Sequence, residues 1–326
     1  MPEDSKRVAL CHLPTPIEEL PRLSRALGGP RILVKRDDLT GLAAGGNKAR
    51  KLEYLIADAL QQKATTVITA GAPQSNHARQ TAAAAARYGL QCVLVLGPLA
   101  PPERQGNLLL DDLFGARIRW AGDRDRHALM EEVAAEERSA GRKAYIIPYG
   151  GSNAIGASAY VVAMDELFRQ ALHQGLHLDH IVIASSSGGT QAGIVTGARA
   201  LSFRGRILGI SVDKPAAALR RIIVDLSQLT AAHLGLHEEV EPEHVHISDA
   251  YLGEGYGVLG EAEREAIRLV ARTEGLLLDP VYTGRAMAGL IDLTRQGEFA
   301  SQETVLFWHT GGTPALFAYA HQLLGR

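Results

Sequence analysis

The chain alternates between short apolar runs bounded by turn residues and longer segments with helical periodicity, and this alternation limits the fold more than any other feature. The apolar runs predict the strands RILVKRD from Arg31, TVITAG from Thr66, CVLVLG from Cys92, RIRW from Arg117, YIIP from Tyr145, HIVIAS from His180, RILGISVD from Arg206 and TVLFWH from Thr304. Helical patterns lie between them at about 51–63, 76–88, 103–114, 126–140, 158–174, 190–202, 260–274 and 314–324. Because continuous apolar strands that alternate with helices are typical of parallel sheets covered on both faces, the sequence predicts an α/β fold.

The length of the chain suggests two structural units. At 326 residues it exceeds a typical single hydrophobic core. The strands between Thr66 and Pro148 can form one sheet with their helices, and the other strands can form a second sheet that the N-terminal residues join. We therefore expect a smaller α/β domain over 52–160 and a larger one made of 1–51 and 161–326. Ligands of open α/β sheets bind beyond the carboxyl ends of the strands, so the loops there are candidate sites.

Composition and charge exclude several classes of partner. The chain is 46% hydrophobic and 21% charged with a formal net charge of −2, which gives no electrostatic reason to bind nucleic acid or an anionic membrane. Its apolar runs are too short to span a bilayer, and the charged start MPEDSKRVAL lacks the apolar core of a signal peptide, so secretion is not expected. Cys11 and Cys92 show no metal-ligand or CxxC spacing, which predicts free thiols in a reducing cytoplasm and no metal.

The stretch GLAAGGNKARKLEYL, residues 41–55, places basic residues at the start of a predicted helix. One face of this helix is apolar and contains Leu52, Leu55, Ile56, Ala59 and Leu60. Asn47 is the expected N-cap, Lys48 falls at the centre of the apolar face, Lys51 lies at its edge, and Arg50 is expected to point to water. Burial and the positive end of the helix dipole both disfavour an ammonium group, so Lys48 is expected to have a lowered pKa that suits Schiff-base chemistry. The alternative is an ordinary amphipathic helix whose first lysine extends to solvent.

Two strand ends lead into helices through small polar residues. After TVITAG come Ser75, Asn76 and His77, which either cap the helix or hold a carboxylate or a ring hydroxyl. After HIVIAS comes SSSGGT, whose glycines allow backbone N–H groups to face an anion at a helix N-terminus. The chain has no GxxxxGK[ST] motif and no GxGxxG after this strand, which favours a single phosphate over ATP or a dinucleotide. The alternative is a tight turn that requires small residues.

A third loop, HTGGTP from His309, repeats the order of strand, glycines and helix, with Pro314 at the first helical position. It is either another anion loop or a place where the backbone packs against a flat ring. The segments GEGYG and DPVYTGRAMAGL each add one tyrosine, Tyr256 and Tyr282, and a lone tyrosine is more often a packing residue. A reactive lysine, a cradle for one phosphate, tyrosines and small hydroxyls together favour a pyridoxal-phosphate pocket.

The ordered motifs GGNKARKLEYL, QSNHARQTAAAAA, SGGTQAG, GEGYG, LLLDPVYTGRAMAGLID and HTGGTPALFAY resemble those of the D-cysteine desulfhydrase/1-aminocyclopropane-1-carboxylate deaminase family. The resemblance runs from about His12 to Leu324. Members of this family are fold-type II pyridoxal-phosphate enzymes of the tryptophan synthase β-like superfamily. The resemblance therefore implies two open, mostly parallel twisted sheets flanked by helices, pyridoxal 5'-phosphate as cofactor in the larger domain, a small amino acid as substrate, and a homodimer.

The resemblance also implies roles for individual residues. Lys48 would bind the cofactor aldehyde as a Schiff base and move the Cα proton of the substrate, and Lys51 would lie near the phosphate. The cofactor would further contact Asn76 at the ring hydroxyl, the phosphate cradle Ser187, Gly188, Gly189 and Thr190, and Thr310 at the pyridine nitrogen. The residues expected to bind substrate are Ser75, Asn76, His77 and Tyr282, with Ser75 and His77 on its carboxylate. The residues expected to be catalytic are Lys48, Ser75, Tyr256 and Tyr282, while Arg50 has no expected role.

Two threonines distinguish the branches of the family. The cyclopropane deaminases are similar but carry a glutamate after the tyrosine of the DPVY segment and a leucine after the histidine of the HxGG loop, where this chain has Thr283 and Thr310. A glutamate keeps the pyridine nitrogen protonated, which ring opening requires because it has no good leaving group. A neutral threonine suffices when a thiolate leaves. The sequence therefore resembles the desulfhydrase branch.

The expected function is α,β-elimination of D-cysteine to pyruvate, ammonia and hydrogen sulfide. The preference for D-cysteine over L-cysteine follows from the resemblance alone. L-cysteate sulfo-lyase activity, 1-aminocyclopropane-1-carboxylate deaminase activity and elimination from other β-substituted alanines are alternatives. A phosphate-ligand-binding α/β protein without lyase activity is the alternative of another class, and it leaves the inward-facing Lys48 unexplained.

Overall fold

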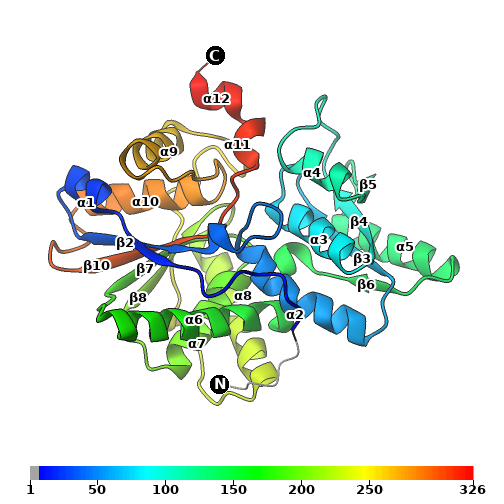
Figure 1. The fold of residues 1–326 in the computed structure, drawn as a ribbon, viewed down its shortest axis with the longest axis horizontal. Helices are drawn as coiled ribbons and strands as arrows, with labels where there is room; N and C mark the ends of the chain where they lie inside the picture. The colour runs from blue at the N-terminus through cyan, green and yellow to red at the C-terminus, as the bar shows by residue number, and fades with distance from the viewer. Residues whose placement is uncertain (1–6, 326) are drawn as a thin grey trace.

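The computed structural model describes residues 7–325, in which two sheets lie side by side (Figure 1). The larger sheet has the order β1-β2-β10-β7-β8-β9, and only β1 is antiparallel to its neighbour. Its strands are Ile17–Glu19 (β1), Arg31–Arg36 (β2), Thr304–His309 (β10), His180–Ser185 (β7), Arg206–Ser211 (β8) and His246–Ser248 (β9). The smaller sheet is parallel, with the order β5-β4-β3-β6. Its strands are Arg117–Trp120 (β5), Gln91–Leu96 (β4), Thr66–Gly71 (β3) and Ala144–Ile146 (β6).

Helices cover both faces of each sheet, because successive side chains of a buried strand point to opposite faces. In β10, Leu306 and Trp308 pack against α6, α7 and α8, while Val305 and Phe307 pack against α1, α9 and α10. In the smaller sheet α2, α3 and α4 cover one face and α5 the other. The helices are Pro21–Leu27 (α1), Asn47–Gln61 (α2), Asn76–Arg87 (α3), Asn107–Leu113 (α4), Arg126–Ser139 (α5), Ala154–Gln174 (α6), Gly189–Ala200 (α7), Ala216–Leu234 (α8), Glu261–Glu274 (α9), Thr283–Arg295 (α10), Ala315–Ala318 (α11) and Ala320–Leu324 (α12). The predicted fold class is confirmed.

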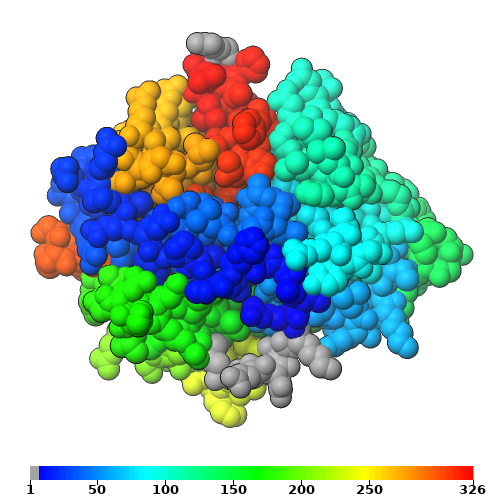
Figure 2. All heavy atoms as spheres, in the orientation of Figure 1, coloured from blue at the N-terminus to red at the C-terminus, as the bar shows by residue number. Residues whose placement is uncertain are grey.

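All eight predicted strands are present, but the prediction omitted several elements. The short strands β1 and β9 and the helices α1, α8 and α10 were not expected. Helix α10 starts inside the turn-like sequence DPVYTG, and α8 contains a run of β-branched residues. Both features lower the helix propensity of the local sequence, so neither helix was predicted. The expected domain boundaries fall inside α2 and α6, and the division into domains remains a prediction. Figure 2 shows the blue N-terminal segment lying between the green surface of α6 and the cyan surface of α3.

The prediction that Arg50 points to water is wrong. Its side chain is buried, with 2% exposed, and its guanidinium donates to Asp37 at 2.9 Å and to Glu166 at 2.8 Å. Asp37 also accepts hydrogen bonds from Tyr160 at 2.5 Å and from the indole of Trp308 at 2.9 Å. Arg50 therefore ties α2 to the end of β2, to α6 and to β10, and this network sets the position of the residues next to Arg50 on α2.

We expect Arg50→Ala to lower the free energy of unfolding of the apoenzyme by about 3–5 kcal/mol, because removing one partner of a buried pair leaves an uncompensated charge. The matched control is Arg295→Ala, which removes a half-exposed pair with Glu265 and should cost about 0–1 kcal/mol. Urea unfolding followed by circular dichroism measures both. Equal losses in the two variants would contradict the structural role of Arg50.

Candidate active site

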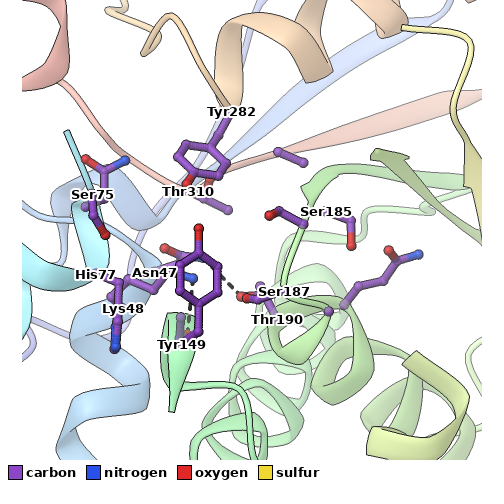
Figure 3. A pocket seen from close by; sticks show the side chains of 16 residues that line it. Asn47, Lys48, Ser75, His77, Tyr149, Ser185, Ser187, Thr190, Tyr282 and Thr310 are labelled. Carbon is purple, nitrogen blue, oxygen red and sulfur yellow. Dashed lines mark hydrogen bonds between the residues drawn. The ribbon is translucent and has the colours of Figure 1, made fainter. Parts of the chain in front are cut away.

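A pocket lies where the carboxyl ends of β3, β7 and β10 face the start of α2. Figure 3 shows Ser75, His77 and Lys48 on one side of it and Ser185, Ser187 and Thr190 on the other, with Tyr282 and Thr310 across one end. The residues that line it are Asn47, Lys48, Ser75, Asn76, His77, Tyr149, Gly150, Ala184, Ser185, Ser186, Ser187, Gly188, Thr190, Gln191, Tyr282 and Thr310. The strand-end loops singled out in the sequence therefore meet at one place.

Lys48 lies in the first turn of α2 and lines this pocket. The N-cap is Gly46, so the prediction of Asn47 as N-cap is wrong; Asn47 is the first helical residue and donates from its side chain to Thr190 Oγ1 at 3.0 Å. Lys48 Nζ donates to the carbonyl of Gly150 at 3.3 Å, and it makes no ion pair within residues 7–325. Removal from water lowers the pKa of Lys48 from 10.5 to about 8. A substantial fraction of this lysine is a neutral, nucleophilic amine near pH 8.

Lys51 lies deeper than the sequence suggested. Its side chain is fully buried and donates to the carbonyl of Gly150 at 3.1 Å and to Ser152 Oγ at 3.3 Å. Burial, followed by the charge of Lys48, holds the pKa of Lys51 well below its ordinary value. A Cβ built on Gly189 would lie 2.8 Å from Lys51 Nζ, so this nitrogen sits against the glycine loop rather than in the open pocket. A bound dianion there would restore its positive charge.

The loop SGGT at the start of α7 fits a single phosphate. Gly188 is the N-cap of α7 in a left-handed conformation, φ +83°, and the Gly189 N–H donates to Ser152 Oγ at 3.2 Å. The hydroxyls of Ser152 and Ser187 lie 2.8 Å apart. Backbone N–H groups at a helix N-terminus, several hydroxyls and one buried lysine are the donors that a phosphate dianion requires.

The two glycines of this loop have different surroundings. A Cβ on Gly189 would lie 2.6 Å from Ser152 Oγ, whereas a Cβ on Gly188 would point toward α8, 3.1 Å from Ile222 and 3.2 Å from Ile223. Glycine is therefore needed at position 188 for its left-handed backbone conformation. At position 189 it is needed because a side chain would collide with Ser152 and Lys51.

The start of α3 offers donors for a carboxylate. Ser75 is its N-cap and accepts from the Ala78 N–H at 3.1 Å, so the capping alternative is correct, and Ser75 also lines the pocket. His77 Nε2 lies 2.9 Å from Thr69 Oγ1, whose single proton goes to the carbonyl of Ile147. His77 Nε2 then donates to Thr69 Oγ1, and Nδ1 has no hydrogen-bond partner within residues 7–325. Burial and the charges of Lys48 and Lys51 hold the pKa of His77 well below its ordinary value. A carboxylate would consequently be held by Ser75 and the free N–H groups of the first helical turn rather than by the His77 ring.

Three tyrosines lie in or next to the pocket. The hydroxyls of Tyr256 and Tyr282 lie 2.6 Å apart, and Tyr282 lines the pocket while Tyr256 lies behind it. Tyr149, which was not predicted as a site residue, lines the pocket and contacts Tyr256 through its hydroxyl. Burial raises the pKa of all three phenols, well above the ordinary value for Tyr256 and Tyr282. They are neutral groups that can donate or accept a proton in a hydrogen bond.

Of the two branch-defining threonines only Thr310 faces the pocket. The Thr283 hydroxyl is occupied, since it accepts from the Asp279 N–H at 2.7 Å and donates to the Asp279 carboxylate at 2.8 Å. The carbonyl of Thr310 accepts from the Asn47 N–H at 3.0 Å, which fixes this loop against the start of α2. A contact between the Thr310 hydroxyl and the pyridine nitrogen remains a prediction.

Further residues in or beside the pocket had no predicted role. Gly150 lines the pocket and Ser152 bonds to Lys51 beside it, and both belong to the segment YGGSN, which follows β6. Ser185 and Ser186, from the predicted loop SSSGGT, and Gln191 also line the pocket. The sequence could have indicated the YGGSN residues, because this segment is another loop of small residues between a predicted strand and a helix. Within residues 7–325 no cluster of three or more histidine, cysteine, aspartate or glutamate side chains could hold a metal ion. In the same range no helix combines the length and apolarity needed to cross a membrane.

A lysine of lowered pKa beside a glycine loop at a helix N-terminus, at the strand ends of a two-sheet α/β fold, suits an enzyme that carries a phosphorylated aldehyde cofactor. The profile of the family described as "Pyridoxal-phosphate dependent enzyme" matches residues 8–311. The chain belongs to this family, and its cofactor is pyridoxal 5'-phosphate.

Individual relatives agree with this assignment. The chain is 45% identical over 319 residues to a D-cysteine desulfhydrase of Salmonella typhi, a match that covers 96% of both proteins. A solved structure described as an ACC deaminase homologue superposes with a TM-score of 0.90 at 42% identity, covering 98% of this chain and 96% of the other. A pyridoxal 5'-phosphate-dependent aspartate racemase has a TM-score of 0.65 at 20% identity, over 91% of this chain and 90% of its own, which shows the fold alone. The resemblance stated from the motifs is confirmed.

The pKa of Lys48 predicts how cofactor uptake depends on pH. The neutral amine is the form that reacts with an aldehyde, and a pKa of about 8 makes it half populated near pH 8. We expect the rate at which the apoenzyme forms a borohydride-reducible link to pyridoxal phosphate to rise up to about pH 8 and then to level off. Nα-acetyl-lysine is the control, and its rate should keep rising toward its ordinary pKa of about 10.4. An enzyme rate that also rises past pH 9 would contradict the effect of burial.

Proposed function

We propose that this enzyme is a carbon–sulfur lyase that converts D-cysteine and water to pyruvate, ammonia and hydrogen sulfide. The observation that carries the proposal is the combination of the pocket chemistry with the relative that is 45% identical over nearly the whole chain and is named D-cysteine desulfhydrase. Bound pyridoxal phosphate supplies the electron sink that makes the Cα proton of an amino acid acidic. The protein must hold the substrate, remove that proton and assist the leaving thiolate.

The pocket residues suit these tasks. The Lys48 amine, with a pKa of about 8, is the base for the proton at Cα. Ser75 and the N-terminus of α3 hold the substrate carboxylate. Tyr282, supported by Tyr256 at 2.6 Å, is a neutral donor for the departing sulfur. Thr310 supplies a neutral hydroxyl for the pyridine nitrogen, which is sufficient when a thiolate accepts the electrons.

Ring opening of 1-aminocyclopropane-1-carboxylate is the second candidate, because the ACC deaminase homologue has a similar structure over almost the whole chain. Against it, Thr283 stands where that branch has a glutamate, and its hydroxyl is bound to Asp279 rather than directed to the pocket. A phosphate-binding protein without lysine chemistry is disfavoured because it gives no role to Lys48. Homodimer formation and a cytoplasmic location are also proposed; the family resemblance supports the first, and the free thiols of Cys11 and Cys92 support the second.

The test is a comparison of D-cysteine, L-cysteine and L-cysteate as substrates of the purified holoenzyme. We expect D-cysteine to give pyruvate and sulfide in equal amounts at the highest rate. The matched control is Thr81→Val, a buried substitution on α3 outside the pocket, which should keep the same order of substrates. Faster formation of pyruvate and sulfite from L-cysteate would instead make this enzyme a sulfo-lyase.

A further inference from the structure

A buried arginine beneath the pocket holds one pocket residue in a single orientation. Arg79, on α3, is 0% exposed, and its Nη1 donates to Asn76 Oδ1 at 3.0 Å and to Asn107 Oδ1 at 2.6 Å. Its Nη2 donates to the carbonyl of Gly45 at 2.9 Å, in the loop that leads to Lys48. Arg79 therefore joins α3, α4 and the loop before α2, and α3 and α4 lie side by side (Figure 1).

The guanidinium fixes which way the Asn76 amide points. A guanidinium can only donate, so the Asn76 atom that faces Arg79 must be the oxygen. The Asn107 side chain donates a second hydrogen bond to the same oxygen at 2.9 Å and is itself held by the carbonyl of Gln74 at 2.8 Å. The Nδ2 of Asn76 has no acceptor among residues 7–325, and Asn76 lines the pocket. Asn76 thus presents an N–H donor, and not a carbonyl oxygen, to whatever the pocket holds.

Within residues 7–325, no carboxylate forms a hydrogen bond with the Arg79 guanidinium. Asp111 interacts with Arg79 through space, but in the described part of the chain both carboxylate oxygens of Asp111 lack a hydrogen-bond partner. Burial raises the pKa of Asp111 to about 8, which disfavours its charged form, while burial lowers the pKa of Arg79 only to about 10. Asp279 also acts on Arg79 through space, but its oxygens accept from Val281, Tyr282 and Thr283 at the start of α10.

A buried cation that polarises an amide donor suits an anionic oxygen in the pocket. Pyridoxal phosphate has one oxygen of this kind besides its phosphate, the ring hydroxyl, which readily ionises. We infer that Arg79 is a positioning residue for the cofactor, which holds the Asn76 N–H toward the ring oxygen and, through Asn76, stabilises that oxygen as an anion. Asn107 supports the same orientation. This inference rests on the proposed contact between Asn76 and the ring hydroxyl.

The test compares two cofactors on the apoenzyme and uses no substrate, so its failure is separate from that of the proposed lyase activity. Dissociation constants are measured for pyridoxal phosphate and for its analogue that lacks the ring hydroxyl. Loss of one charge-assisted hydrogen bond corresponds to roughly a 10- to 100-fold loss of affinity. We expect Arg79→Met to lose about this much affinity for pyridoxal phosphate and little for the deoxy analogue. Arg79→Lys, which keeps the charge without the forked geometry, should recover part of the loss.

Further variants separate positioning from general damage to α3. Asn107→Leu should change the ratio of the affinities for pyridoxal phosphate and its deoxy analogue in the same direction as Arg79→Met. If Arg79→Met does not fold, the Asn107→Leu variant replaces it in the test. Thr81→Val, on the same helix with a buried hydroxyl that bonds to none of the described residues, should change neither affinity. Equal losses for both cofactors in the Arg79 and Asn107 variants would overturn the inference. Equal losses in Asn76→Ala would overturn the contact between Asn76 and the ring on which it rests.

Discussion

Replacing Lys48 with alanine should abolish both turnover and covalent attachment of the cofactor. Lys48 lines the pocket, and because its pKa is about 8, a large fraction of its amine is neutral and can react with the cofactor aldehyde. Loss of a general base alone typically lowers a rate by ~10²–10⁴-fold, and loss of the covalent link should lower it further. Pyruvate formation from D-cysteine measures the rate, and mass spectrometry after borohydride treatment detects the link.

Lys51→Ala is the informative comparison. Lys51 lies against the glycine loop and bonds to Ser152, so its removal should weaken cofactor binding while the link to Lys48 still forms. The exposed Lys63 controls for the loss of a lysine as such, and Lys63→Ala should behave as wild type. A borohydride-trapped lysine adduct in the Lys48→Ala protein would refute the assignment of Lys48.

Gly189→Asp should prevent cofactor binding while the fold is retained. Its Cβ would lie 2.6 Å from Ser152 Oγ and 2.8 Å from Lys51 Nζ, which places the new carboxylate among the donors expected to hold the phosphate. Loss of two charge-assisted hydrogen bonds at about 1.5–3 kcal/mol each would weaken binding by at least ~100-fold. Titration of the apoenzyme with pyridoxal phosphate measures the affinity, and circular dichroism verifies the fold.

Gly188→Ala is the control for this position. Its Cβ faces Ile222 and Ile223 of α8, and the residue has a φ of +83°, so we expect lower stability with a much smaller effect on cofactor affinity. If Gly189→Asp bound the cofactor as wild type does, the phosphate would have to lie elsewhere. If instead Gly188→Ala lost more affinity than Gly189→Asp, the assignment of the two glycines would be reversed.

Local sequence patterns were sufficient for eight of the ten strands within residues 7–325 and for three of the loops that meet at the pocket, but not for the short strands β1 and β9 or the YGGSN loop. A run such as HIVIAS followed by SSSGGT contains the buried strand, the glycine turn and the helix start in adjacent residues. The inward direction of Lys48 also followed from local periodicity, since Leu52 and Leu55 mark the buried face of the same helix. These features depend on neighbours along the chain, and the sequence therefore contains them directly.

Features that depend on distant partners were not predictable in this way. Arg50 was expected at the surface because a charged residue off the apolar face is normally solvated, but its partners Asp37 and Glu166 lie in other elements. Asn76 was identified from its motif, whereas its orientation depends on Asn107 of α4. Gly188 and Gly189 are the same residue type in adjacent positions, but a Cβ would point toward α8 at Gly188 and toward Ser152 and Lys51 at Gly189. This difference depends on the backbone conformation, which the sequence does not show.

The activity of the wild-type holoenzyme on D-cysteine beside 1-aminocyclopropane-1-carboxylate tests the central claim most directly. The neutral Thr310 in the pocket and the occupied Thr283 favour elimination of a good leaving group over opening of a carbon ring. We expect rapid release of pyruvate and sulfide from D-cysteine and no measurable 2-oxobutanoate from the cyclopropane substrate. Efficient formation of 2-oxobutanoate, with little sulfide from D-cysteine, would contradict the assignment of this enzyme as a carbon–sulfur lyase.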